Sequence, residues 1–342
     1  MRGLHRPIGL WLCLASACDS VATPTVGQTT SRASDGNSAG LHPSSSVVAL
    51  PASPSAAASG SSSSARPVAS TDSASARDLA SKYPWLSDTA CDGPAVVGSL
   101  SDRFATPRGF RRVALTDGSF GAWLRTLPLA SSEAPVLTFK GKVLHPATHE
   151  NIAAVVAIDI GHADLQQCAD SVIRLHAEWR WSRGDRSMSY RAAAGTMMSL
   201  ESWWRGARPV ADGAKLRWEP TGRPTEPSHS SFRHYLDDVF AWANTGSLSV
   251  QAKPVDVRDL TPGDFVVVAG SPGHAVLVLD MAQDDKGHRR VLLGQGYMPA
   301  QSFQVLRPNR ESPWFEIEPD TDGLTTPFWP TFPWSSLRRL HP

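Results

Sequence analysis

Hydrophobic residues recur at helical spacing in two long segments of the chain, and this pattern predicts its two main helices. Residues 162–181 and 228–248 have apolar side chains three and four positions apart, so each segment forms one apolar stripe. We expect the first helix to begin at Asp164 and the second to be capped by Ser230 or Ser231. Short polar side chains suit these positions because they accept hydrogen bonds from the free N–H groups of a first helical turn.

Shorter apolar runs, bounded by turn-forming residues, predict strands around these helices. The predicted strands are residues 109–115, 136–144, 151–161, 265–268, 274–279, 289–294 and 302–306. Residues 118–129, opened by Ser119, and residues 199–209 predict two short helices. Residues 326–340 contain too many prolines for regular structure, so we expect them to lie irregularly across the domain. The mixture of elements predicts an α+β fold.

The composition divides the chain into a polar N-terminal segment and a globular part. Residues 19–78 are rich in Ser, Ala, Thr, Pro and Gly and have almost no large apolar side chain. Such a segment cannot bury enough surface to offset the entropy lost on ordering, so we expect a disordered tether. The globular domain then covers residues 79–342, with an N-terminal lobe at about 79–227, a core at about 228–310 and an aromatic C-terminal clasp at 311–342.

Residues 1–18 have the layout of a secretory signal peptide. Arg2 and Arg6 precede an apolar stretch from Ile8 to Leu14, and small residues lead to Cys18. The apolar stretch is far shorter than the ~20 residues that a membrane span needs. The sequence ASAC resembles a bacterial lipobox, which implies lipidation of Cys18; an ordinary cleaved signal peptide is the alternative. We therefore expect an exported protein, lipid-anchored at the periplasmic face of a bacterial membrane.

Charge and motif spacing argue against several classes of ligand. The formal net charge is +1, so nothing favours a nucleic-acid partner. His145, His149 and His162 lack the spacing of a helical metal motif such as HExxH. The GSPGHA loop has neither the lysine nor the strand-to-helix setting of a phosphate-binding loop. We expect neither a metal nor a cofactor.

Three further polar or thiol side chains have more than one interpretation. If Cys18 is lipidated and Cys13 is removed, Cys91 and Cys168 remain, either as a disulfide or as two buried thiols. Asp159 lies inside an apolar strand, where an ionised carboxylate needs partners. It either lines a pocket or satisfies backbone amides at the following helix.

The segment LTPGDFVVVAGSPGHAVLVLDM, residues 260–281, has a histidine at the start of its second apolar run. A strand end holds an imidazole rigidly, and a neighbouring strand can hold its second nitrogen. The PGD turn, the strand headed by His274 and the next strand with Gln295 resemble the core of NlpC/P60-type papain-like cell-wall peptidases. This resemblance covers residues 228–306 and implies a helix packed on an antiparallel sheet. His274 would be the general base and Gln295 the residue that orients it, whereas Asp264 tightens the turn.

The chain departs from the peptidase pattern at the position of the nucleophile. Where that family has a cysteine at the start of the helix, this chain has Ser231, and a helix N-terminus activates a thiol far better than a hydroxyl. Either Ser231 is an unusual nucleophile, or the activity is lost and a pocket remains. Cys168, in the first turn of the other long helix, is the second candidate. Its alternatives are a core position or a disulfide with Cys91.

Over a greater length, from Pro107 to Ile317, the chain resembles a bacterial family called domain of unknown function 4846. The segments that carry this resemblance are PRGFRRV, SFGAWLRTLPL, VVAIDIGHADLQQCADSVIRLHAEW, PGDFVVVAGSPGHAVLVLDMA, GQGYMPAQSFQVL and SPWFEI. The resemblance implies no activity, but it groups the residues selected above on chemical grounds.

Two functions follow from these patterns. In the first, an envelope lipoprotein cleaves peptide or amide bonds of peptidoglycan stem peptides, with Ser231 or Cys168 as nucleophile. In the second, the same protein is catalytically silent and holds a wall peptide or an envelope protein near His274. Both require that the imidazole lie at a sheet margin, beside a cleft and facing the start of a helix.

Overall fold

The computed structural model describes residues 71–89 and 91–341, which belong to one unit of the chain, residues 66–342. The predicted signal peptide with Cys18 and the predicted tether as far as residue 70 lie outside the described residues.

Helix α1 (Thr71–Lys82) opens the described part of the chain. The predicted tether extended to residue 78, whereas the helix begins at Thr71 and is anchored at its C-terminal end. Leu79 packs against the main core. Tyr83, just after the helix, is fully buried, and its hydroxyl donates to the carbonyl of Trp123 at 2.9 Å. This apolar anchor offsets the entropy lost on ordering.

A nine-stranded sheet forms the centre of the unit, and all its paired strands are antiparallel. In order, the main path contains β11 (Lys253–Pro254), β19 (Leu337–Arg339), β12 (Phe265–Val268), β13 (His274–Gln283), β14 (Arg289–Gln295), β15 (Gln304–Leu306) and β6 (Ile152–Val155). Off this path, β2 (Arg111–Arg112) pairs with β13, and β16 (Phe315–Ile317) pairs with β14. The predicted α+β class is therefore correct.

The remaining elements surround this sheet. The helices are α2 (Leu100–Arg103), α3 (Phe120–Leu124), α4 (Cys168–Ser182), α5 (Leu200–Trp204), α6 (His229–Trp242) and α7 (Thr245–Gln251), with 3-10 turns η1 (Pro84–Leu86), η2 (Val257–Asp259) and η3 (Trp334–Ser336). The two-stranded sheets are β1 (Gly98–Ser99) with β3 (Pro128–Leu129), β4 (Val136–Leu137) with β5 (Val143–His145), β7 (Ser189–Arg191) with β8 (Met197–Ser199), β9 (Arg208–Asp212) with β10 (Lys215–Glu219), and β17 (Gly323–Thr326) with β18 (Trp329–Pro333).

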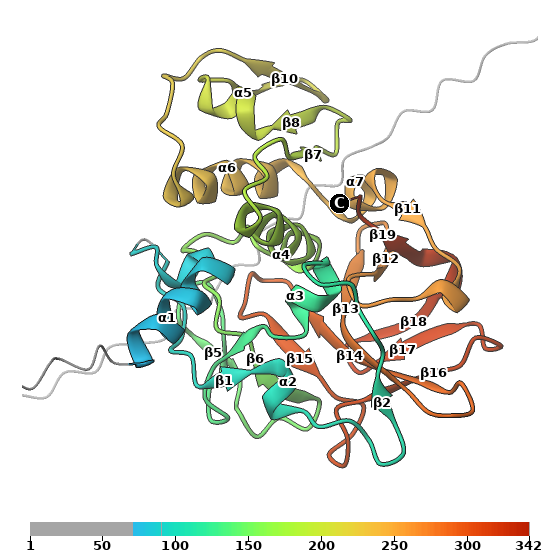
Figure 1. Cartoon of the computed structure of the whole chain (residues 1–342). Helices are drawn as coiled ribbons and strands as arrows, with labels where there is room; N and C mark the ends of the chain where they lie inside the picture. The colour runs from blue at the N-terminus through green and yellow to red at the C-terminus, as the bar shows by residue number, and fades with distance from the viewer. Residues whose placement is uncertain (1–70, 90, 342) are drawn as a thin grey trace, which may run out of the picture. The chain divides into compact units, whose positions relative to one another are not determined.

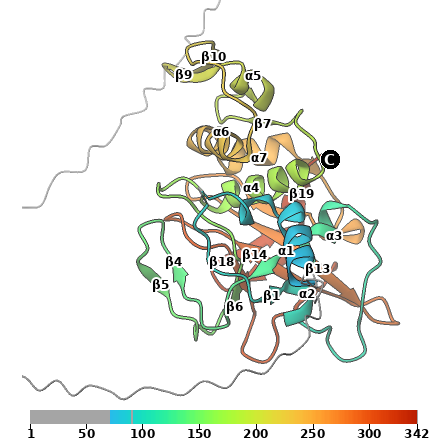
Figure 2. The same cartoon turned by 60° about the vertical axis from the view of Figure 1, so that its left-hand side comes forward.

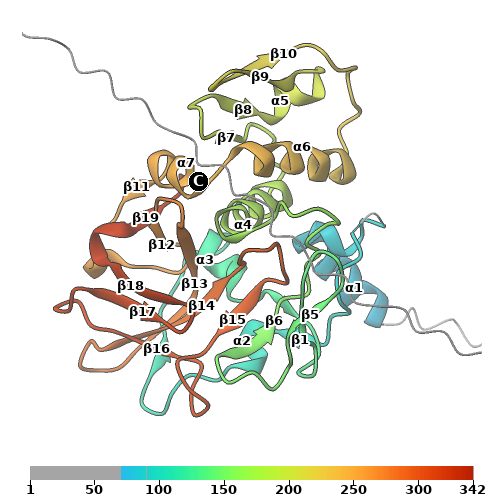
Figure 3. The same cartoon turned by 180° about the vertical axis from the view of Figure 1, so that it is seen from behind.

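The two faces of β13 have different partners. Ala275 and Leu277 point into the main core with α4, whereas Val276 and Val278 point into a second core that includes Phe332 of β18. This alternation follows from the two-residue repeat of a strand. Helix α4 lies across the sheet, with α6, α5 and the small β7–β10 strands on its far side (Figure 1). The β17–β18 hairpin lies beside the central strands in the reverse view (Figure 3).

Both long helices begin at residues other than those expected. Helix α4 begins at Cys168, four positions after Asp164, because the Asp164 carboxylate is used elsewhere. It accepts hydrogen bonds from the Ala300 amide at 2.7 Å and from the Gln167 side chain at 3.0 Å. Helix α6 is capped by Ser228 rather than by Ser230 or Ser231.

Two predicted strands also differ in the structure. Residues 136–144 form the β4–β5 hairpin instead of one strand, because Gly141 adopts a left-handed turn conformation with φ 72°. Figure 2 shows this hairpin beside β6. Residues 151–161 continue as strand β6 only to Val155.

The proline-rich tail is more regular than expected. It forms β17, β18 and η3, and its last strand, β19, joins the central sheet beside β12. The prediction of an irregular tail was wrong because Pro330 and Pro333 lie exposed on β18 of a two-stranded hairpin, where a missing N–H is tolerated.

The PGD turn before β12 is built around one glycine and one carboxylate. Gly263 has φ 100°, and a Cβ there would lie 3.0 Å from the Phe120 ring. Asp264 accepts a hydrogen bond from the Thr261 amide at 2.8 Å and forms an ion pair with Arg339 of β19. Asp264 therefore closes the turn and ties it to the C-terminal strand.

Asp280 connects β13 to two elements of the N-terminal half. Its carboxylate is fully buried and receives hydrogen bonds from Arg112 of β2 at 2.6 Å and from Arg125 after α3 at 2.7 Å. A buried carboxylate with two guanidinium partners costs far more to disrupt than an exposed pair.

None of the helices in the described ranges, 71–89 and 91–341, has both the length and the apolar character needed to cross a bilayer.

We predict that Asp280→Ala lowers the free energy of unfolding by about 3–5 kcal/mol, because it leaves two guanidiniums without their buried partner. Chemical denaturation measures this change. Asp285→Ala is the matched control, since Asp285 forms an exposed ion pair with Arg111 and should have a much smaller effect. Equal effects of the two substitutions would contradict this account.

Candidate functional site

The structure brings His274 and Gln295 together, as the sequence predicts. His274 is the first residue of β13 and Gln295 the last residue of β14. The imidazole Nε2 lies 2.8 Å from the Gln295 Oε1. Because a carbonyl oxygen only accepts, Nε2 donates and the neutral ring has its lone pair on Nδ1. Nδ1 has no hydrogen-bond partner among residues 71–89 and 91–341.

Three aromatic rings surround the His274 ring, and no pattern in the sequence marked them as part of the site. The rings of Tyr297, Trp329 and Phe332 lie 4.7, 5.3 and 5.9 Å from the His274 ring, between centroids. The His274 side chain is only 1% exposed. Burial lowers the pKa of His274 to about 4, although the hydrogen bond to Gln295 acts in the opposite direction. The imidazole is therefore neutral at neutral pH.

Cys168 lies at the first position of α4, next to the backbone of His274. Its Sγ lies 4.0 Å from the Gly273 carbonyl oxygen, and the Ala275 N–H also faces the sulfur. Burial and Asp170 raise the pKa of the Cys168 thiol, whereas the backbone N–H groups of Ala275 and of the helix start lower it. The net pKa is raised to about 11, so the resting group is a thiol.

Glycine residues allow α4 to approach the strand ends this closely. A Cβ on Gly296 would lie 2.2 Å from the Ser171 Oγ and 2.9 Å from the Gln167 carbonyl oxygen. The residue after Gln295 is therefore in direct contact with the first turn of the helix that carries Cys168. Gly296, the second glycine of GQGY, was the signal in the sequence that another element approaches the backbone closely at this point.

The thiol contacts the backbone beside His274, but no hydrogen bond joins it to the imidazole in the described part of the chain. Cys168 belongs to α4, which packs on the face of β13 that contains Ala275. The His274 ring lies with Phe332 on the opposite face, at the first residue of the strand. The thiol and the imidazole therefore lie on different sides of the strand that begins with His274.

Ser231 is not brought to His274. It lies at the third position of α6, and its hydroxyl forms a capping box with Ser228. The same oxygen accepts a hydrogen bond from Trp204 Nε1 at 2.9 Å and donates to the Glu226 carbonyl at 2.9 Å. The Ser231 hydroxyl has a complete structural role in this position.

Asp159 is held by charged side chains rather than by backbone amides at the helix start. Arg174 of α4 donates to it at 2.7 Å and Arg233 of α6 at 3.2 Å. Burial acts to raise the pKa of Asp159, but the Arg174 guanidinium outweighs it and holds that pKa well below its usual range. Gln166 accepts from Arg174 at 2.9 Å, so the same arginine fixes the loop that leads into Cys168.

Cys91 and Cys168 are free thiols, and the alternative of a disulfide between them is not formed. Cys91 lies instead near Asp159.

Comparison with known proteins identifies the family of the chain. Residues 100–339 match the family model described as domain of unknown function (4846). The match covers well over half of the chain, so the protein belongs to this family. No curated protein and no solved structure matches the chain.

We predict that His274 stays neutral well below pH 6.5, as a single tautomer with the proton on Nε2. Imidazole ¹⁵N chemical shifts followed by NMR would show one N–H nitrogen and a titration midpoint near pH 4. Gln295→Ala should produce a mixture of tautomers. A midpoint near 6.5 in the wild type would show that the ring is not enclosed as described.

The same shift predicts how stability depends on pH. The unfolded chain takes up a proton on His274 at higher pH than the folded protein does, so the free energy of unfolding decreases as pH falls from 6.5 to 4. The contribution of this group is about 3 kcal/mol at 1.36 kcal/mol per pKa unit. Denaturation of wild type and His274→Gln between pH 7 and pH 4 isolates it, because the variant should lose stability less steeply.

Proposed function

We propose that this protein is an envelope lipoprotein that hydrolyses peptide or amide bonds, with Cys168 as nucleophile, His274 as general base and Gln295 as the residue that orients the base. One observation carries this proposal: the Cys168 Sγ, at a helix N-terminus, lies 4.0 Å from the carbonyl of the residue before His274, whose ring is held by Gln295. A thiol, a base and an orienting amide are the parts of a thiol hydrolase.

The proposal includes a papain-like arrangement with a different helix from the one first expected. The cysteine-bearing helix is α4 rather than α6, and Cys168 takes the place assigned to Ser231. In support, α4 packs on β13, and the ends of β13 and β14 hold His274 and Gln295.

In the proposed reaction, Nδ1 of His274 takes the proton of the Cys168 thiol as the sulfur attacks the substrate carbonyl. The oxyanion is stabilised by the Cys168 backbone N–H, one of the helix N–H groups without an intrahelical partner. The imidazolium then gives its proton to the leaving amine, and an acyl-thioester remains. Water, deprotonated by the same nitrogen, releases the acid and restores the thiol.

The protonation states of Cys168 and His274 in the resting protein indicate at which step the thiolate forms. The Cys168 pKa of about 11 and the His274 pKa of about 4 favour the neutral pair over a thiolate–imidazolium pair. Burial also raises the pKa of Asp170 to about 8, so this carboxyl is largely neutral at pH 7 and its effect on the thiol is reduced. Proton transfer is therefore coupled to attack, after a movement that brings the ring onto the sulfur.

A second candidate function is a catalytically silent protein that holds a wall peptide or an envelope protein. The lack of a thiol–imidazole hydrogen bond in the described ranges favours it. Both candidates have the same proposed location, at the periplasmic face of a bacterial membrane through lipidated Cys18.

We predict that Cys168→Ala reduces release of peptide fragments from purified cell wall by about a thousandfold or more, because the nucleophile is removed. Chromatography of the soluble products measures the release. Ser231→Ala is the control and should retain activity, since that hydroxyl belongs to the capping box of α6 and accepts from the Ser228 amide. Equal release by wild type and Cys168→Ala, or none by either, would leave only the binding function.

We also predict that Cys18→Ser moves the protein from the membrane fraction to the soluble fraction, because a serine hydroxyl cannot form the lipid thioether. Fractionation followed by immunoblotting measures the distribution. A variant that sediments with membranes as completely as wild type would show that another contact anchors the protein.

A further inference from the structure

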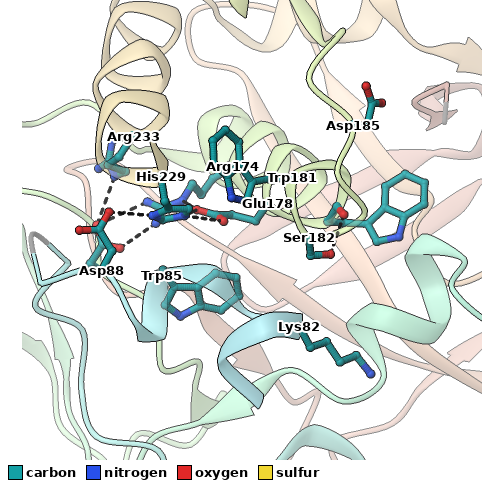
Figure 4. A network of polar contacts seen from close by, with 12 residues as sticks. Lys82, Trp85, Asp88, Arg174, Glu178, Trp181, Ser182, Asp185, His229 and Arg233 are labelled. Carbon is teal, nitrogen blue, oxygen red and sulfur yellow. Dashed lines mark hydrogen bonds and ion pairs between the residues drawn. The ribbon is translucent and has the colours of Figure 1, made fainter. Parts of the chain in front are cut away.

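A cluster of charged side chains joins the turn after η1 to helices α4 and α6. It contains none of the residues proposed for the hydrolase. In Figure 4 the imidazole of His229 lies between the carboxylates of Asp88 and Glu178. Its Nδ1 is 2.7 Å from Asp88 Oδ2, and its Nε2 is 3.0 Å from Glu178 Oε2. Every ring nitrogen thus has a carboxylate partner.

A thiol completes this cluster. Cys91 lies one turn after Asp88, and its backbone N–H donates to the Asp88 carbonyl at 3.0 Å, which brings both side chains to one side of the turn. The Cys91 sulfur, one Asp88 oxygen and one His229 nitrogen all lie within 4.8 Å of one another. All three residues are partly buried.

We propose that Asp88, Cys91 and His229 bind a Zn²⁺ ion. Thiolate, imidazole and carboxylate are the three ligand types that zinc takes from proteins. Tetrahedral zinc with bonds of about 2.0–2.3 Å needs ligand atoms about 3.5 Å apart, so small side-chain rotations from the present separations suffice. Three protein ligands leave the fourth position to water.

The surroundings of His229 match those of a zinc ligand. With Nδ1 on the metal, Nε2 donates its proton to Glu178, and a carboxylate in this position orients the ring and increases its basicity. Glu178 is itself fixed, because it is fully buried and accepts from Arg174 at 2.8 Å.

The charges of the cluster also favour this ion. Asp88, Asp159, Glu178 and Asp237 contribute four negative charges, against two positive charges from Arg174 and Arg233. This excess of negative charge favours a divalent cation beside Asp88.

Motif spacing along the chain does not reveal this site, because its ligands are far apart in the sequence. Asp88 and Cys91 follow η1, whereas His229 is the first residue of α6. The turn is held in place by Trp85, whose Nε1 donates to the Ala157 carbonyl at 2.8 Å. By joining this turn to α6, the ion would fix the N-terminal segment to the domain.

Cobalt substitution tests the proposal directly. Folded, metal-free protein, titrated with Co²⁺, should bind one ion per chain and develop a near-ultraviolet thiolate-to-cobalt charge-transfer band. Cys168→Ser, the matched control, should keep the band, whereas Cys91→Ser should lose it. A band that survives Cys91→Ser, or that disappears in Cys168→Ser, would overturn the assignment, as would the absence of one-to-one binding.

A measurement on the wild type keeps the proposal testable if Cys91→Ser fails to fold. Alkylation with iodoacetamide, followed by peptide mass spectrometry, compares each cysteine with and without one equivalent of Zn²⁺. We expect Zn²⁺ to reduce the alkylation rate of Cys91 at least tenfold and to leave that of Cys168 unchanged. Unchanged alkylation of Cys91, or protection of Cys168 alone, would contradict the site.

Discussion

The close contact between the first turn of α4 and the ends of β13 and β14 is the constraint on which the rest of the structure depends. Gly296 permits it, since a Cβ would collide with the Ser171 hydroxyl and the Gln167 carbonyl. Ala275 of β13 is buried in the main core together with residues of α4. This contact places a helix N-terminus and its cysteine beside the strand that begins with His274, so that core packing and candidate chemistry have one origin.

The charged network around Arg174 is a second interaction that fixes the position of α4. Arg174 connects Asp159, Gln166 and Glu178, and it therefore fixes both the loop before Cys168 and the middle of the helix. A buried arginine pays a large desolvation cost, which its two carboxylate partners offset only in this geometry. The proposed zinc ligands adjoin this network, so metal binding and helix position are mechanically connected.

The sequence predicted the α+β class, the two long helices and the pairing of His274 with Gln295, because each rests on a local period or on adjacent strands. It did not predict the start of α4. Helix propensity allows Asp164 as a cap, but its carboxylate is bound by the distant Ala300 amide. The aromatic enclosure was missed for a similar reason, since Trp329 and Phe332 reach His274 only through the path of the C-terminal hairpin. Choosing Cys168 over Ser231 also required tertiary contacts.

The irregularity in β13 has a consequence for how related chains can vary. Val278 pairs with Leu293 and Asp280 with Leu292, so Leu279 is an extra residue with no partner of its own. Leu279 packs into the main core, while the adjacent Asp280 binds Arg112 and Arg125. In a related chain without this extra residue, the side chain of the aspartate would point to the opposite face of the strand. The inserted residue and the two arginines are therefore expected to appear and disappear together in evolution.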